Sequence, residues 1–181
     1  MDILNELVGY LNIPADEVYT NNPTKITYNF QKKKYYPSYT TDRYGMSCTD
    51  VNGVLYFIGG EHEDYYDPNF FIYNDVIKIE NKKVTIYGYP REIFPPTDFH
   101  ASVYLNDFIW IFGSIGYQKL RKKFIQVCRL NTHTMKIDNL NNSSGPLWTH
   151  FEENKITIED GFIKINNFLF DTITFMWKEL I

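Results

Sequence analysis

The chain has 181 residues, of which 18% are aromatic, and it contains 20 isoleucines but only two alanines. β-Branched and aromatic residues favour strands, whereas alanine is the best helix former, so this composition predicts a single, mainly β domain. The net charge of −4 argues against a general nucleic-acid binder, which needs a basic surface.

The apolar runs are all too short to cross a membrane as a helix, so no membrane partner is expected. The N-terminus lacks the basic start and apolar core of a secretion signal, and we therefore expect a cytoplasmic protein. Cys48 and Cys128 are too few for a disulfide framework. Each lies in a strand-like run, where we expect a buried free thiol.

The first 42 residues are expected to form an N-terminal helix and an extended segment. In residues 2–11 the apolar side chains recur with the spacing of one helix face, and Asp2 is a suitable cap. Residues 24–30 alternate between apolar and polar side chains, which predicts a strand. The lysine run at residues 32–34 is interpreted as a solvated edge.

From residue 43 onward the sequence repeats. Residues 54–60 follow the turn Asn52-Gly53, and residues 108–114 follow Asn106-Asp107 at an offset of 106 − 52 = 54. A second match relates residues 74–86 to residues 126–137 at an offset of 131 − 80 = 51. A third and weaker copy follows, and each unit can be read as four strands. The predicted units are residues 43–93, 94–142 and 143–181.

A four-stranded unit of about 50 residues, with a double glycine ending its second strand, resembles the kelch repeat of β-propellers. The matching residues are Gly59-Gly60, Asn74-Asp75-Val76 and the last-strand stretch from Asp171 to Trp177. Residues 60–68 and 89–100 are similar to a group of short bacterial kelch-like proteins. The second unit has Ser114 in place of the second glycine, and the third unit has no glycine pair. The resemblance implies a kelch-like β-propeller fragment of three four-stranded antiparallel blades; it implies no activity.

Three blades do not close a ring, because typical propellers hold four to eight of them. Two chains related by a twofold axis would complete a six-bladed ring, which predicts a homodimer. The alternatives are that residues 1–42 cover the ends of an open arc, or that a different protein does.

Strands that run alternately up and down place each loop between a second and a third strand on one face of the blades. The connections that lead into each first strand lie on the same face, which we call the loop face. Ligand contacts are expected there, because loops vary in chemistry while strands are constrained by packing. We predict a module that binds a protein or peptide without a cofactor, with the candidate binding residues Glu61, His62, Asp64, Tyr65, Asp67, Arg121, Trp148 and His150. His133 is expected on the surface at the opposite end.

The alternative is a small metal-assisted or acid–base enzyme with its site at the channel mouth. Asp98 and His100 are two residues apart, so on a strand both side chains would point to one side as a catalytic pair. Glu61, His100 and His150 are weak candidates for metal ligands, because loop membership alone does not show that they converge. The sequence contains no phosphate-binding loop, no zinc-type cysteine pairs and no Gly-x-Ser-x-Gly elbow.

Overall fold

The computed structural model describes residues 13–14, 24–25, 38–39, 43–62, 70–113, 116–140, 144–147 and 156–180. Within these residues the protein is all-β, and the only helix is one 3₁₀ turn, η2 (Gln118–Leu120). None of the described helices is long and apolar enough to cross a membrane. The helix expected at residues 2–11 lies outside the described residues.

The first large sheet contains β4 (Ser47–Val51), β5 (Val54–Ile58), β8 (Asp75–Glu80) and β9 (Lys83–Gly88), which are antiparallel. A fifth strand, β2 (Thr24–Lys25), pairs with β9 and is the described part of the strand expected at residues 24–30. Two small ladders join β1 (Ile13–Pro14) to β3 (Ser38–Tyr39), and β6 (Glu61–His62) to β7 (Phe71–Ile72).

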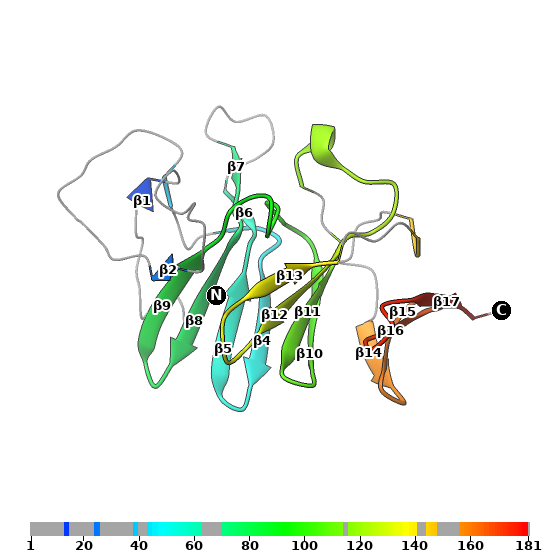
Figure 1. Ribbon diagram of the computed structural model, residues 1–181. Coiled ribbons are helices and arrows are strands. Elements are labelled where there is room, and N and C mark those ends of the chain that lie inside the picture. Colours follow the sequence, from blue (N-terminus) through cyan, green and yellow to red (C-terminus); the bar gives the residue numbers. More distant parts are fainter. Residues whose placement is uncertain are drawn as a thin grey trace.

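The second sheet is an antiparallel meander of β10 (Ala101–Leu105), β11 (Phe108–Phe112), β12 (Val127–Asn131) and β13 (Ile137–Asn139). The third repeats this order with β14 (Ile156–Glu159), β15 (Phe162–Ile165), β16 (Phe168–Asp171) and β17 (Trp177–Glu179). Figure 1 shows the three sheets following one another along the chain from β4 to β17. The expectation of three four-stranded antiparallel sheets is confirmed.

A tight turn joins β4 to β5, β10 to β11 and β14 to β15 in the three large sheets. The turns are Asn52-Gly53, Asn106-Asp107 and Asp160-Gly161, and all six residues have positive φ angles between 49° and 83°. Two consecutive positive φ angles give the turn whose twist matches the flanking strands. The third turn follows the second at 160 − 106 = 54 residues, so the period found between the first two units extends through the third.

Two hydrophobic cores separate the three sheets, and β11 contributes to both. Its side chains alternate, so that Ile109 and Ile111 pack towards the first sheet while Trp110 and Phe112 pack towards the third. The continuous apolar sequence of β11 is therefore the pattern of a strand buried on both faces. The second sheet is thus enclosed between its two neighbours.

The first strands of the three sheets lie side by side, with β10 between β4 and β14. Two hydroxyl groups connect β4 to β10, because Thr49 Oγ1 and Ser102 Oγ are 2.8 Å apart. Cys48 on β4 is exposed, which corrects the expectation of a buried thiol there, whereas Cys128 on β12 is buried as expected. The exposure of Cys48 follows from alternation, since its neighbour Thr49 is the residue that faces inward.

A buried ion pair holds the start of the first sheet together. The Arg43 guanidinium donates to both carboxylate oxygens of Asp75, at 2.6 and 2.9 Å, and both side chains are fully buried. The same guanidinium donates to the Gly59 carbonyl at 2.8 Å and lies 3.6 Å from the centre of the Tyr73 ring. Arg43 thus joins the segment before β4, the end of β5 and the start of β8.

Replacing Arg43 by alanine would leave the Asp75 carboxylate buried without its partner. We expect Arg43→Ala to lower the free energy of unfolding by about 3 to 5 kcal/mol, measured by urea denaturation. The control is Lys164→Ala, which removes the partly exposed ion pair with Glu159 and should cost at most about 1 kcal/mol. Equal losses in the two variants would show that the buried pair has no special structural role.

Candidate functional site

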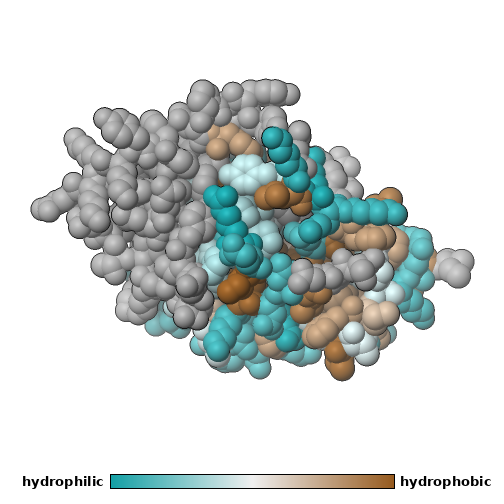
Figure 2. Space-filling view, turned by 45° about the horizontal axis from the view of Figure 1, so that its top comes forward, coloured by the Kyte–Doolittle hydropathy of each residue, from teal (hydrophilic) through white to brown (hydrophobic). Residues whose placement is uncertain are grey.

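A pocket with a volume of about 200 Å³ opens on the loop face, next to the second sheet. It lies between the connection leading into β10 and the loop between β11 and β12, as the alternation of strand direction predicts. Figure 2 turns this end forward and shows hydrophobic and hydrophilic side chains intermingled on it. The pocket is lined by Arg91, Pro95, Pro96, Gly116, Tyr117, Leu120, Arg121, Lys122, Phe124 and Gln126.

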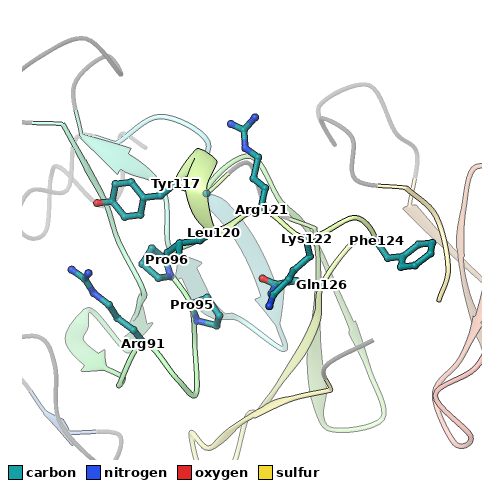
Figure 3. A pocket seen from close by; sticks show the side chains of 10 residues that line it. Arg91, Pro95, Pro96, Tyr117, Leu120, Arg121, Lys122, Phe124 and Gln126 are labelled. Carbon is teal, nitrogen blue, oxygen red and sulfur yellow. The ribbon is translucent and has the colours of Figure 1, made fainter. Parts of the chain in front are cut away.

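The pocket lining differs chemically from one part to another. In Figure 3, Arg91 and Phe124 lie on opposite sides, and Pro95, Pro96 and Leu120 lie between them. Leu120 is 61% exposed, so an apolar side chain is accessible at the pocket. The pocket therefore offers an apolar middle with a guanidinium at one side and an aromatic ring at the other.

The loop that carries most of the lining is anchored to its neighbours at several points. The Tyr117 hydroxyl accepts a hydrogen bond from the Ile72 backbone N–H of β7 at 2.9 Å. Ile125 N–H donates to the Pro146 carbonyl at 3.1 Å, and Phe124 forms a bridge with Leu147 on the connection towards the third sheet. These contacts fix the lining before any ligand arrives, which lowers the entropic cost of binding.

The pocket rim is basic although the chain is acidic. Arg91, Arg121 and Lys122 line it, and Lys119 and Lys123 are exposed on the same loop. The sequence contains no acidic residue between Asp107 and Asp138. Positive charge is thus concentrated here in a chain whose net charge is −4.

Asp98 lies buried behind the pocket, where it supports the lining. Its Oδ1 atom accepts a hydrogen bond from the Gly116 N–H at 2.5 Å, and Glu61 lies close to its side chain. Burial raises the pKa of the Asp98 carboxyl, while Gly116, Glu61 and the charge of Arg121 oppose that rise. The approach of Asp98 to Glu61 brings the loops of the first and second sheets together.

His100 has a different partner from the one that its spacing suggests. Its Nε2 atom lies 2.7 Å from Ser47 Oγ, whereas its buried Nδ1 atom has no hydrogen-bond partner, so no hydrogen bond joins it to Asp98. Burial lowers the pKa of His100 to about 4. So weak a base removes a serine proton poorly, because efficient general bases have pKa values near the working pH. The contact between Ser47 and His100 is best explained as a link between β4 and the start of β10.

The structure brings together some of the predicted site residues. Glu61 and Arg121 both lie close to Asp98 on the loop face. For His62 only the backbone, in β6, is described. The predicted residues outside the described part of the chain are Asp64, Tyr65, Asp67, Trp148 and His150. Among the described residues no three His, Cys, Asp or Glu side chains are grouped as metal ligands.

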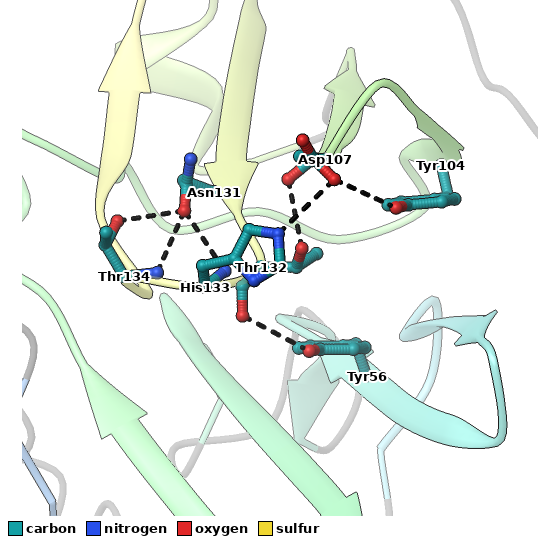
Figure 4. A network of polar contacts seen from close by, with 7 residues as sticks. All are labelled: Tyr56, Tyr104, Asp107, Asn131, Thr132, His133 and Thr134. Carbon is teal, nitrogen blue, oxygen red and sulfur yellow. Dashed lines mark hydrogen bonds and ion pairs between the residues drawn. The ribbon is translucent and has the colours of Figure 1, made fainter.

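His133 lies at the opposite end, exposed on the turn between β12 and β13, as expected. Figure 4 shows the surrounding network, in which His133 Nε2 is 3.3 Å from Asp107 Oδ1 and the Thr132 hydroxyl donates to the Asp107 carbonyl at 3.0 Å. The Asn131 carboxamide oxygen accepts from the backbone N–H groups of His133 and Thr134. These contacts join the two hairpin turns of the second sheet.

Sequence reasoning missed most of the pocket lining. Tyr117, Leu120, Phe124 and the Pro95-Pro96 pair were not among the candidates, and Ser47 was not recognised as the partner of His100. The one usable signal was composition, because residues 116–126 combine a basic run with aromatic residues in a loop.

Comparison with known proteins leaves the site to be interpreted from its own geometry. The chain matches no protein-family model and no curated protein. The resemblance to kelch repeats therefore rests on the sequence features quoted above.

The burial of His100 predicts a dependence of stability on pH. Its pKa is about 4 in the folded protein against 6.5 for the free side chain, so its neutral form favours folding. This contribution is complete above pH 6.5 and is lost as the pH falls towards 4, by about 3 kcal/mol in total. Urea denaturation at several pH values measures the free energy of unfolding of the wild type and of His100→Asn. The difference between the two free energies should shrink as the pH falls from 6.5 towards 4. His133→Gln, which changes an exposed histidine, is the control. If the difference in free energy of unfolding between the wild type and His100→Asn did not change with pH, burial of His100 would not be the cause of the pH dependence.

Proposed function

We propose that the protein is a binding module whose loop face holds a protein or peptide partner in the pocket beside the second sheet. The observation that carries this proposal is the pocket itself, in which an exposed leucine, prolines, a phenylalanine and two arginines surround about 200 Å³. Clefts that hold cofactors or drug-sized molecules are usually larger, about 300 to 1,000 Å³. A pocket of this size instead suits an anchoring side chain of a larger partner.

The lining also indicates the chemistry of that partner. Its apolar middle complements an aliphatic or aromatic side chain, and the arginines beside it complement acidic neighbours. Arginine and aromatic residues are the types most often found at the energetic centres of protein interfaces. The enzyme alternative has less support, because Asp98 and His100 make separate contacts and His100 is a weak base.

We further propose that the three sheets are blades of a partial, kelch-like β-propeller. Three features support this arrangement: face-to-face packing of successive four-stranded sheets, adjacent first strands, and a constant 54-residue spacing of the first turns (160 − 106 and 106 − 52). In such an arc the loops of neighbouring blades meet on one face, where the pocket lies.

The pocket can be tested with peptides selected from a random display library on the immobilised protein. We expect Leu120→Ala and Arg121→Ala each to weaken binding of a selected peptide by about 1 to 3 kcal/mol, roughly 5- to 150-fold, measured by isothermal titration calorimetry. Lys82→Ala is the matched control, because Lys82 is exposed in the turn between β8 and β9, at the other end. Peptides that keep full affinity for both pocket variants would place the binding surface elsewhere.

A further inference from the structure

The outer face of the third sheet has a regular chemical pattern. Ile163, Ile165 and Phe170 point into the core shared with the second sheet, so the residues between them point outward. The strand register arranges these outward residues in two rows that cross the sheet. The first row contains Glu159, Phe162, Asp171 and Met176, and the second contains Thr157, Lys164, Leu169 and Lys178.

Apolar side chains are exposed at one end of this face. Phe162 is 37% exposed, Met176 is 62% exposed, and Ile173, at the tip of the adjoining turn, is 87% exposed. The turn has a close counterpart in the second sheet, because Asp171 accepts from the N–H groups two and three residues later, as Asn131 does. At the position of Ile173 that counterpart carries His133, which lies in the polar network of Figure 4. An isoleucine in place of a hydrated residue suggests a surface that another molecule covers.

The other large sheet faces of the described structure are covered to a greater extent. Both faces of the second sheet lie in the two cores. The outer face of the first sheet is buried over β5, β8 and β9, since Phe57, Ile77 and Ile86 are at most 4% exposed and belong to neither of these cores, and it is exposed at the edge strand β4, where Cys48 lies. The outer face of the third sheet is therefore the most open one in this part of the chain.

We propose that this face is the contact surface for a second copy of the chain. In the first row the charged residues, Glu159 and Asp171, are acidic, and in the second row the charged residues, Lys164 and Lys178, are basic. The two copies are related by a twofold axis that lies in the interface, runs across the strands and passes between the two rows. This axis places the acidic row of each copy opposite the basic row of the other copy. The exposed Lys164–Glu159 ion pair within one chain, 3.0 Å long, is worth at most about 1 kcal/mol and can exchange for contacts with the partner.

The area of the face determines how strong this association is. Three strands of four residues and one of three, spaced about 4.8 Å apart with a rise of about 3.3 Å per residue, cover roughly 19 by 13 Å. That is small for a stable interface, so the dimer forms reversibly and at high concentration. It also differs from a closed six-bladed ring, in which the third sheet of one chain would meet the first sheet of the other.

Charge exchange tests the proposal by sedimentation equilibrium from about 5 μM to about 1 mM protein. The acidic variant combines Lys164→Glu with Lys178→Glu, and the basic variant combines Thr157→Lys with Glu159→Lys; Asp171 is kept because it caps its turn. We expect a monomer–dimer equilibrium for the wild type and association at least about tenfold weaker for each variant alone, because like charges then face each other. An equimolar mixture of the two variants should recover association, since opposite charges then meet.

Lys136→Glu is the control, because it makes one exchange of lysine for glutamate at an exposed site just before β13 and should associate like the wild type. Urea denaturation of each variant shows whether it is folded. A wild type that stays monomeric at every concentration would overturn the proposal. So would a dimer that neither variant weakens, since it would use a different surface, or a mixture of variants that fails to associate.

Discussion

The buried ion pair between Arg43 and Asp75 is the interaction on which the junction between the first sheet and the connection into β10 depends. It holds the Gly59 carbonyl in place, and the double glycine then allows the connection into β10 to approach closely. Gly60 N–H donates to the Thr97 carbonyl at 2.8 Å, and a Cβ atom on Gly59 would collide with that same carbonyl. The next residue is Asp98, which supports the pocket. A charge pair in the first sheet thus sets the geometry of a site beside the second.

The roles of the side chains around the pocket favour binding over catalysis. Most of the lining belongs to one loop, but the hydrogen bonds that hold this loop come from β7, from Asp98 and from the connection to the third sheet. The titratable groups nearby are used in that support: Asp98 contacts Gly116 and Glu61, and His100 contacts Ser47. Side chains whose hydrogen bonds hold the backbone in place are less available for transferring protons to a ligand.

The sheets could be predicted because their signals are local. The Asn52-Gly53 and Asn106-Asp107 turns and the alternation of apolar residues specify hairpins within a few residues of sequence. Asp160-Gly161 carried the same signal at the same spacing and could have placed the third sheet equally well. The pocket depends on contacts between distant residues, such as Gly116 with Asp98 and Tyr117 with Ile72. No periodic pattern encodes these pairs, so the sequence indicated the face but not the residues that line the site.

The position of β11 between two cores has a consequence for how the sequence can change. Ile109 and Ile111 are matched to side chains of the first sheet, while Trp110 and Phe112 are matched to those of the third. A change of side-chain volume at Ile109 or Ile111 is compensated in the core shared with the first sheet. A change at Trp110 or Phe112 is compensated in the core shared with the third sheet. Homologous chains should therefore show two separate sets of covarying positions interleaved along one strand, and the insertion of a single residue there would exchange the two sets at once.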